Sequence, residues 1–243
     1  MEQPGSAKFA RGKIYLIPSA LGPEGTDAIP DSTRKIINDL FFFIVENERS
    51  ARRFLRSIGY TRDFDEVILQ KTERDEDFSA GSLLVNHLFL GHPAGVLSEA
   101  GCPGIADPGA AVVRWAHEQG FQVVPLPGPS SIFLALMASG LNGQQFAFHG
   151  YLPIAATERK TRLKQLEEES KRKNQTQVFM ETPYRNEALL KDLLSILKNN
   201  TQLCIAMAIT LPSEDIFTQP VGAWKNRLPD LKKKPAIFLI LAT

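Results

Sequence analysis

The stretch from residue 94 to residue 109 contains the residues whose types and spacing are best suited to hold a ligand. A short apolar run, Ala94–Leu97, is followed by a loop that is dense in glycine and proline and that carries Ser98, Glu99 and Asp107. Glycine permits positive φ and lets a ligand approach the backbone, whereas proline fixes φ. This composition predicts a strand and a shaped loop, with polar groups at the strand end where open α/β sheets bind ligands. An ordinary turn is the alternative interpretation.

Four further loops with small or polar residues follow apolar runs elsewhere in the chain. They comprise residues 18–25, 46–49, 127–131 and 181–185. Proteins of the α/β class commonly build one site from several such strand ends. The sequence contains no G-x-x-x-x-G-K-[ST] phosphate loop, no G-x-G-x-x-G motif opening a helix and no G-x-S-x-G nucleophile elbow. An ATPase, an NAD-dependent enzyme and a serine hydrolase are therefore all disfavoured.

A row of arginines is a second feature that could bind a ligand. Arg49, Arg52, Arg53 and Arg56 stand at i, i+3, i+4 and i+7, so a helix would place all of them on one face. Guanidinium groups bind phosphate in a bidentate manner. A solvated helix face is the alternative explanation of such a row.

The elements that must position these groups alternate regularly through the first half of the chain. Apolar β-prone runs predict strands at residues 13–18, 40–45, 64–69, 94–97 and 121–125. Helical spacing predicts a first helix with Asp31 or Ser32 as its N-cap and a second helix directly after residues 46–49. Further helices are predicted at residues 82–90, 110–118 and 132–138. This alternation predicts a parallel sheet with helices on both faces.

The second half of the chain repeats the α/β pattern with more charge. Strands are predicted at residues 146–148, 177–180, 203–209 and 236–241, helices at 158–173 and 187–197, and a short helix or turn at 224–231. The charged helix at 158–173 is expected to be solvated, a partner-binding face being the alternative. We expect two α/β domains, residues 1–126 and 127–243.

Composition and charge restrict the class of protein further. The chain has 28 Lys and Arg against 27 Asp and Glu, a formal net charge of +1, so a polyanion site would have to be a local patch. Cys102 and Cys204 form no C-x-x-C pair, and the four histidines show no metal-binding spacing. We therefore expect no disulfide, no metal and a cytoplasmic location. No apolar run approaches the roughly 20 residues of a membrane helix, and no secretory signal precedes the first strand.

Several motifs together resemble those of one known family. Residues 97–109 (LSEAGCPGIADPG), 125–131 (PLPGPSS), 138–141 (ASGL) and 148–153 (FHGYLP) resemble, in order, successive motifs of the S-adenosylmethionine-dependent tetrapyrrole methylase superfamily. The most similar branch methylates a ribose 2′-hydroxyl of small-subunit ribosomal RNA. The resemblance implies two α/β domains, an N-terminal one with a mostly parallel sheet and a C-terminal one with a mixed sheet, a cofactor cleft between them, and a homodimer.

The resemblance also implies a set of cofactor-binding residues. The family holds S-adenosylmethionine largely through backbone groups and small side chains, which a Gly/Pro loop leaves accessible. The candidates carried over by motif are Ser98, Glu99, Gly101, Cys102, Pro103 and Ile105 in the central loop, Ser130 and Ser131 in the next loop, and Met180, Ala208 and Ala236 at strand ends of the second domain.

Methyl transfer from a sulfonium needs an in-line nucleophile and, for a hydroxyl, a base. Glu46, Glu99 and Glu181 are candidate bases at predicted strand ends. Arg49 and Arg185 are candidates to neutralise a substrate phosphate. Glu181 and Arg185 belong to ETPYR, which resembles the Glu-Ser-x-His-Arg motif of the branch. A structural role is the alternative for each carboxylate.

The chain departs from the family pattern at several positions. Residues 46–49 read ENER where Glu-Asp-Thr-Arg is usual, and Glu99 replaces an Asp. Tyr184 replaces a His, which removes a group that titrates near neutrality. Residues 207–211 read MAITL where the branch has Arg-Glu-Leu-Thr-Lys, and the chain ends without the C-terminal segment of longer members. Cofactor binding is therefore carried over more firmly than substrate identity.

Three functions stay open on the sequence. The first is an RNA ribose methyltransferase that acts on ribosomal RNA or the small ribosomal subunit, with the arginine row and Lys232–Lys234 as basic patches. The second is a methyltransferase of a tetrapyrrole or another small molecule. The third is a non-catalytic S-adenosylmethionine-binding protein, which the altered residues 207–211 would explain.

Overall fold

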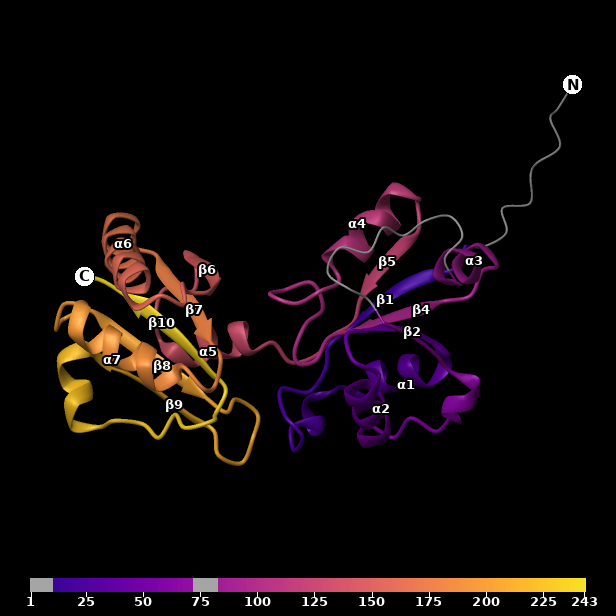
Figure 1. The fold of residues 1–243 in the computed structure, drawn as a ribbon, viewed down its shortest axis with the longest axis horizontal. Coiled ribbons are helices and arrows are strands. Elements are labelled where there is room, and N and C mark those ends of the chain that lie inside the picture. Colours follow the sequence, from indigo (N-terminus) through magenta and orange to yellow (C-terminus); the bar gives the residue numbers. More distant parts are fainter. Residues whose placement is uncertain (1–10, 72–82) are drawn as a thin grey trace, which may run out of the picture. The chain divides into compact units, whose positions relative to one another are not determined.

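The computed structural model of the chain describes residues 11–71 and 83–243. Its internal contacts divide the chain into two units, Met1–Pro129 and Ser130–Thr243. Each unit contains a five-stranded sheet flanked by helices (Figure 1). The expected fold class of two α/β domains is therefore confirmed.

The first unit is built on a parallel sheet with strand order β3-β2-β4-β1-β5. Every strand pairing described in it is parallel. The strands are β1 (Lys13–Ile17), β2 (Phe42–Val45), β3 (Ile68–Lys71), β4 (Ala94–Leu97) and β5 (Gln122–Pro125). Because parallel strands end at the same edge of a sheet, the loops that follow β1, β2 and β4 lie along one edge.

Helices cover both faces of this sheet. Phe43 and Val45 of β2 belong to a core that includes α1 and α2 residues, whereas Phe42 and Ile44 point into a core with α3 and α4 residues. Burial on two faces explains the uninterrupted apolar sequence of β2. The helices are α1 (Asp31–Asp39), α2 (Glu48–Ser57), α3 (Leu83–Phe89) and α4 (Ala110–Glu118).

The second unit contains a mixed sheet with strand order β6-β7-β10-β8-β9. Only β6 and β7 are parallel among the pairings described; the others are antiparallel. The strands are β6 (Phe146–Tyr151), β7 (Thr176–Glu181), β8 (Gln202–Met207), β9 (Asp215–Pro220) and β10 (Ala236–Leu241). Strand β9 was not among the predicted elements.

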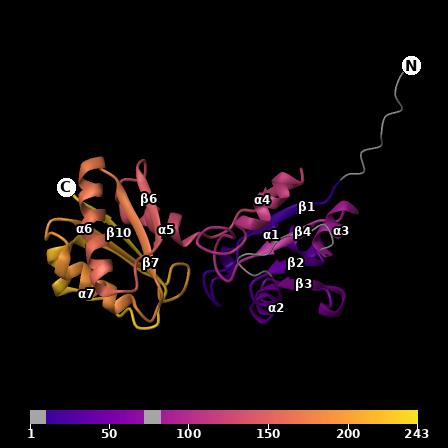
Figure 2. The same ribbon diagram turned by 45° about the horizontal axis from the view of Figure 1, so that its top comes forward.

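Helices α6 and α7 pack on one face of the second sheet and α5 contacts it from the other (Figure 2). Leu163 of α6, Leu193 of α7 and Trp224 share a core with Phe179 and Phe238 of the central strands. Burial of each such side chain contributes about 1.5–3 kcal/mol. The helical elements are α5 (Ser131–Ser139), α6 (Ala156–Lys173), α7 (Asn186–Ile196) and the 3₁₀ helix η3 (Val221–Asn226).

Two local predictions are wrong, the strand that begins at residue 64 and the N-cap at Asp31 or Ser32. Residues Phe64–Glu66 form a 3₁₀ helix, η2, because the Asp63 side chain caps it by accepting from the backbone N–H of Asp65. A further 3₁₀ helix, η1, covers Thr26–Ala28. Pro30, without a side-chain hydrogen bond, is the N-cap of α1, so neither Asp31 nor Ser32 caps that helix. Of the predicted helix at 82–90, residue 82 lies outside the described residues.

Helix α6 is less solvated than its charge predicted. Arg159 is buried and donates from Nε and Nη2 to Oδ2 of Asp192, at 2.8 and 2.6 Å. Glu167 is also buried, and its Oε1 accepts from the backbone N–H of Lys198 at 2.8 Å and from Thr201 Oγ1 at 2.5 Å. These two side chains connect α6 to other elements. Their burial is possible because a buried charge is stable when it is paired or hydrogen bonded. Within the described ranges, no helix has the length and apolarity needed to traverse a bilayer.

Candidate functional site

The loops after β1 and β4 are tied together by buried hydrogen bonds. The Ser19 hydroxyl donates to the Ser98 carbonyl at 2.7 Å, and the Ser98 hydroxyl donates to the Gly101 carbonyl at 3.0 Å. Backbone hydrogen bonds of 2.8 and 3.1 Å connect Ser19 and Gly101 in both directions. Ser19 and Ser98 are both buried. The start of the glycine-rich loop is therefore held in one conformation by the neighbouring strand end.

Two glycines give this loop its shape. Gly101 has a φ of 74° and Gly109, the residue before α4, has a φ of 125°. A hydrogen bond of 3.1 Å from the N–H of Gly104 to the Pro108 carbonyl closes the loop. A Cβ at Gly109 would lie 3.2 Å from the backbone nitrogen of Gly104, so a side chain there would require the loop to shift by a few tenths of an ångström as well as to adopt a positive φ.

The side chains of this loop differ in accessibility. Cys102 is half-buried and its sulfur contacts the Pro129 carbonyl oxygen at 3.7 Å. Pro103 is buried, whereas Ile105 is exposed. Ile105 is thus an apolar side chain at the surface of the candidate cofactor loop, where a ligand can contact it.

Two of the predicted carboxylates come together at the ends of β2 and β4. Glu46 Oε1 accepts from the backbone N–H of Glu99 at 3.3 Å, and the Ser50 hydroxyl donates to Glu99 Oε1 at 2.5 Å. Asn47 caps α2 by accepting from the N–H groups of Arg49 and Ser50. The capped helix therefore carries Ser50 and Arg49 to the edge where Glu46 and Glu99 lie.

The exposed arginine row on α2 divides into two pairs with different surroundings. Arg52 and Arg56 stack over the Phe64 ring, at 5.2 and 4.5 Å from its centroid. Arg53 lines a hollow of about 230 Å³ together with Ser50, Ser57, Glu99, Phe54 and residues of the loop after β1. Arg53 is therefore the arginine of the row that lies beside Glu99 in this hollow, and Arg49, on the first turn of α2, is exposed.

In the second unit, Glu181 is a buried ion-paired carboxylate. Its side chain is 0% exposed, and Oε1 accepts from Arg185 Nη2 at 2.6 Å and from the Thr182 N–H at 2.7 Å. Glu181, predicted as a candidate base, and Arg185, predicted as a candidate to neutralise a substrate phosphate, are therefore brought together as one ion pair.

The predicted cofactor residues of the second unit converge on one edge of its sheet. Ala236 at the start of β10 pairs with Glu181 at the end of β7 and with Met207 at the end of β8. Met180 lies one position earlier on β7, and Ala208 follows β8 with a φ of 51°. The small side chains of Ala208 and Ala236 and the positive φ of Ala208 thus occur at one edge, where a ligand can approach the backbone.

Several buried polar atoms on this edge lack a partner among the residues that the structure describes. They are Glu181 Oε2, Arg185 Nε, Asn186 Oδ1 and Thr210 Oγ1. Asn186 is held in place by donating to the Lys234 carbonyl at 2.7 Å, just before β10. A buried polar group without a hydrogen bond costs about 1–3 kcal/mol. This edge therefore fits a ligand that carries both hydrogen-bond donors and acceptors.

The two remaining candidates lie where the second unit begins. Ser130 precedes α5 as its N-cap without a side-chain hydrogen bond to the helix, and Ser131 is the first helical residue. Throughout residues 11–71 and 83–243, no group of three or more His, Cys, Asp and Glu side chains could hold a metal ion.

Some residues of these clusters were not among the sequence candidates. Ser19 and Ser50 reach the glycine-rich loop from other strand ends, and Asn186 and Thr210 complete the edge of the second sheet. An Asn followed three positions later by Ser at the start of a helix is the one local signal that points to Ser50. The others depend on contacts between distant segments.

Comparison with known proteins then identifies the family. A sequence profile of the family described as Tetrapyrrole (Corrin/Porphyrin) Methylases matches residues 13–224. The chain belongs to this family. As a member of a methylase family it is a methyltransferase, and the resemblance seen in its motifs is confirmed.

Two relatives of this tetrapyrrole methylase are named Ribosomal RNA small subunit methyltransferase I. The protein of Haemophilus influenzae is 36% identical over 235 residues, which cover 94% of this chain and 78% of the relative. The protein of Escherichia coli O157:H7 is 28% identical over 243 residues, which cover 99% of this chain and 81% of the relative. Both similarities extend through the two units.

Solved structures support the fold. The crystal structure of the methyltransferase CobJ superposes with a TM-score of 0.59 at 15% identity, covering 96% of this chain and 95% of CobJ. The cobalt precorrin-4 methyltransferase CbiF gives 0.57 at 15% identity, covering 94% of each chain. The arrangement of a parallel and a mixed sheet in one chain is thus shared with these enzymes.

Proposed function

We propose that this tetrapyrrole methylase transfers the methyl group of S-adenosylmethionine to a ribose 2′-hydroxyl of small-subunit ribosomal RNA. The observation that carries the proposal is the 36% identity to a relative named for small-subunit ribosomal RNA methylation, across 94% of the chain. The structures of small-molecule methyltransferases are only 15% identical to this chain. Sequence similarity therefore favours an RNA acceptor over a tetrapyrrole.

The candidate residues fit the proposed cofactor in both units. The glycine-rich loop offers backbone groups and an exposed apolar side chain, and the second sheet offers orphaned acceptors for amino and hydroxyl donors. Bound S-adenosylmethionine supplies an electrophilic methyl group on a sulfonium. We assign its contacts to Ser98, Glu99, Gly101, Cys102, Pro103, Ile105, Ser130, Ser131, Met180, Ala208 and Ala236.

A 2′-hydroxyl becomes a good nucleophile when a base accepts its proton. We assign this role to Glu46 or Glu99, which are joined at the ends of β2 and β4 by the hydrogen bond from the Glu99 backbone N–H to Glu46 Oε1. Ser50 donates to Glu99 and fixes the orientation of that carboxylate. Arg49, on the first turn of α2, is assigned to a substrate phosphate. A positively charged guanidinium there would hold the ribose beside the carboxylates.

Glu181 is assigned a positioning role instead. Its side chain is 0% exposed and Oε1 is paired with Arg185, so accepting a proton from a substrate hydroxyl would neutralise the carboxylate and leave the Arg185 charge without its partner. In this assignment Glu181 holds Arg185 and presents its second oxygen to the cofactor. Arg185, whose side chain is 30% exposed, keeps part of its guanidinium available for a substrate phosphate. We further propose a homodimer in the cytoplasm.

The proposal is tested with tritiated S-adenosylmethionine and small ribosomal subunits from a strain that lacks the homologous methyltransferase. The wild-type chain should label the ribosomal RNA. Glu46→Gln or Glu99→Gln, whichever removes the base, should lower the rate about 10²–10⁴-fold, whereas Glu158→Gln, at an exposed position on α6, should not. Cofactor binding without transfer to RNA would contradict the proposal, and transfer to a small molecule alone would support the tetrapyrrole alternative.

A further inference from the structure

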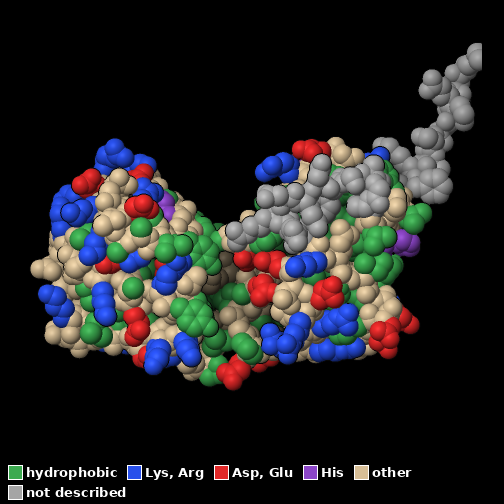
Figure 3. All heavy atoms as spheres, in the orientation of Figure 1, with side chains coloured by type: hydrophobic (Ala, Val, Ile, Leu, Met, Phe, Trp, Pro, Cys, Tyr) green, Lys and Arg blue, Asp and Glu red, His purple; other side chains and the backbone are tan. Residues whose placement is uncertain are grey.

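A basic hollow lies along the C-terminal half of α6, in the second unit. It has a volume of about 420 Å³ and its cationic lining residues are Lys164, Lys171, Arg172 and Lys198. A second hollow of about 340 Å³ continues around the helix and shares Glu168 and Arg172 with the first. Figure 3 shows Lys and Arg side chains gathered over α6. The two hollows together form one grooved, charged surface.

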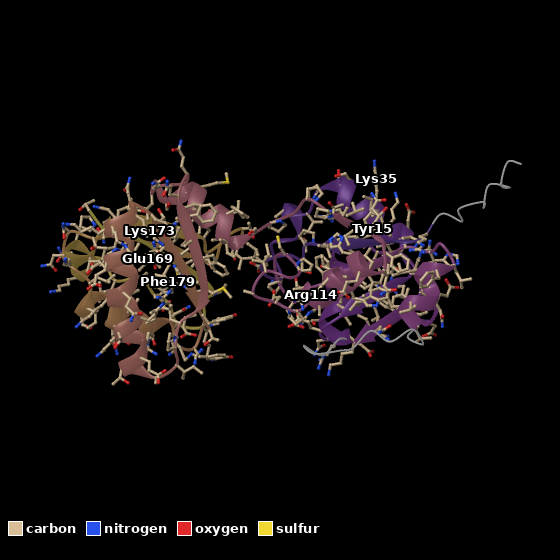
Figure 4. All side chains as sticks on the ribbon, turned by 90° about the horizontal axis from the view of Figure 1, so that it is seen from above. Tyr15, Lys35, Arg114, Glu169, Lys173 and Phe179 are labelled. Carbon is tan, nitrogen blue, oxygen red and sulfur yellow. The ribbon has the colours of Figure 1, made fainter. Side chains whose placement is uncertain are left out.

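The larger hollow keeps an excess of positive charge, because four Lys and Arg side chains line it against Glu167 and Glu168. Glu167 is buried and accepts hydrogen bonds from the Lys198 N–H and the Thr201 hydroxyl. Glu169 forms an ion pair with Lys173 at 2.5 Å, and the two lie together on α6 (Figure 4). Glu168 is therefore the exposed lining carboxylate that faces the cations directly.

Three of the cations are not neutralised by ion pairs. Among the described residues, no carboxylate lies within ion-pair distance of Lys164, Arg172 or Lys198. All three side chains are exposed. Lys171 donates to a backbone oxygen of Thr243, the last residue of the sequence, at 3.1 Å, and is therefore not counted among these three cations. Basic residues in the last turn of α6 complement the helix dipole, but Lys164 and Lys198 lie outside that turn.

The hollow is separate from the candidate cofactor edge of the same unit. It is lined by Thr201 and Ala242, next to the end of the sheet where Leu241 of β10 pairs with Gln202 of β8. The candidate edge lies at the other end of these strands, where Ala236 pairs with Met207. Strands rise about 3.4 Å per residue, so the two ends are roughly 17 Å apart.

We propose that this hollow is a second RNA-binding surface, which contacts backbone phosphates away from the methylated nucleotide. This inference rests on the proposed function. Lys164 and Lys171 are separated by seven positions, which is about 10 Å along a helix, so the cations extend over more than one phosphate. Lysine binds phosphate as a point charge without reading bases. The hollow would therefore add affinity and orientation without sequence preference.

The test compares two triple variants with the same change of net charge. Lys164→Gln, Arg172→Gln and Lys198→Gln remove the exposed cations of the hollow. The matched control replaces Lys35, Lys191 and Lys225, which are exposed elsewhere, by Gln. Binding to protein-free small-subunit ribosomal RNA and to whole small subunits is measured by filter retention between about 50 and about 200 mM salt. Calorimetry with S-adenosylhomocysteine checks that the variants keep their cofactor site.

The hollow variant should bind the ribosomal RNA at least about tenfold more weakly than the control. Its slope of log K against log[salt] should be shallower by about 2–3, since each lost phosphate contact contributes about 0.7–0.9. Equal RNA affinities and slopes for the two variants would overturn the proposal. Weaker binding to whole subunits with unchanged binding to free RNA would also overturn it, because the occupant would then be an acidic protein segment. Failure of the proposed function can be distinguished from failure of this inference, because in the first case the wild-type chain transfers no methyl group to ribosomal RNA.

Discussion

Replacing Gly109 by alanine is expected to distort the loop between β4 and α4 and to weaken cofactor binding. Gly109 has φ 125° and ψ −27°, a region that costs a residue with a side chain about 1–3 kcal/mol. The new Cβ would also lie 3.2 Å from the nitrogen of Gly104, 3.5 Å from Val96 Cγ1 and 3.6 Å from Pro103 Cβ. The loop must therefore shift as well as bear backbone strain.

Gly59→Ala is the matched control for this substitution. Gly59 has φ 85°, lies beyond the end of α2, and an added Cβ there meets nothing within 4 Å. Its strain of about 1–2 kcal/mol therefore lowers stability without moving the glycine-rich loop. Both variants should lose stability, which corresponds to a fall of about 2–4 °C in Tm for each kcal/mol.

The two variants should differ in cofactor affinity. Urea unfolding followed by circular dichroism measures the free energy of unfolding, and titration calorimetry measures the Kd for S-adenosylhomocysteine. We expect Gly109→Ala to weaken binding by about tenfold or more, the equivalent of about 1.4 kcal/mol, and Gly59→Ala to bind like the wild type. If Gly109→Ala loses stability but keeps the wild-type Kd, the loop does not hold the cofactor.

Three further predictions follow from buried groups. Burial lowers the pKa of the His87 imidazole. As pH falls, the unfolded chain therefore protonates this ring before the folded chain does. The contribution of the neutral ring to stability is present above about pH 6.5 and is lost as pH falls below that value. The Tm of the wild type should fall more steeply than that of His87→Gln between about pH 7 and about pH 5, and parallel curves would disprove this. Burial raises the pKa of Cys204 to about 11, so a thiol reagent should label Cys102 in the native chain and Cys204 only in urea; native labelling of Cys102→Ser would be the contrary result. Arg159→Ala should lower the free energy of unfolding by about 3 kcal/mol, because the buried Asp192 loses both hydrogen bonds from Arg159 and keeps only Lys160 at 3.5 Å. Lys173→Ala, at an exposed ion pair, should match the wild type in urea, and equal losses would refute the distinction.

Buried strands could be predicted because their sequence carries the signal directly. Phe42–Val45 is packed on both faces of the first sheet, so all four residues are apolar and fully buried. The glycine-rich loop was equally recognisable, since its backbone needs glycine at positions such as Gly109. Where burial or backbone geometry restricts residue type, the sequence is a sufficient guide.

Edge strands and buried charges could not be predicted for a common reason. Among the strands that the structure describes, β9 pairs with β8 alone, and none of its residues is fully buried, so it shows no apolar run. Arg159 and Glu167 look like solvated helix residues until Asp192 and Thr201 are brought against them from 33 and 34 positions away. Such pairing depends on the tertiary fold rather than on local pattern.

The candidate site was predictable in part for the same reason. Motifs pointed to Ser98 and Glu99, but not to the hydroxyls of Ser19 and Ser50 that hold them. Those contacts join residues 79 and 49 positions apart. They arise because parallel strands bring their carboxyl ends to one edge. The sequence could name the loops, and only the structure could say which side chains meet.

The most direct test of the central claim is nucleoside analysis of small-subunit ribosomal RNA after incubation with the purified chain and S-adenosylmethionine. Mass spectrometry of the digested RNA distinguishes methylation of ribose from methylation of a base. We predict a 2′-O-methylnucleoside that is absent without the enzyme. A methylated base, or RNA without any new methyl group while the cofactor is bound, would contradict the account.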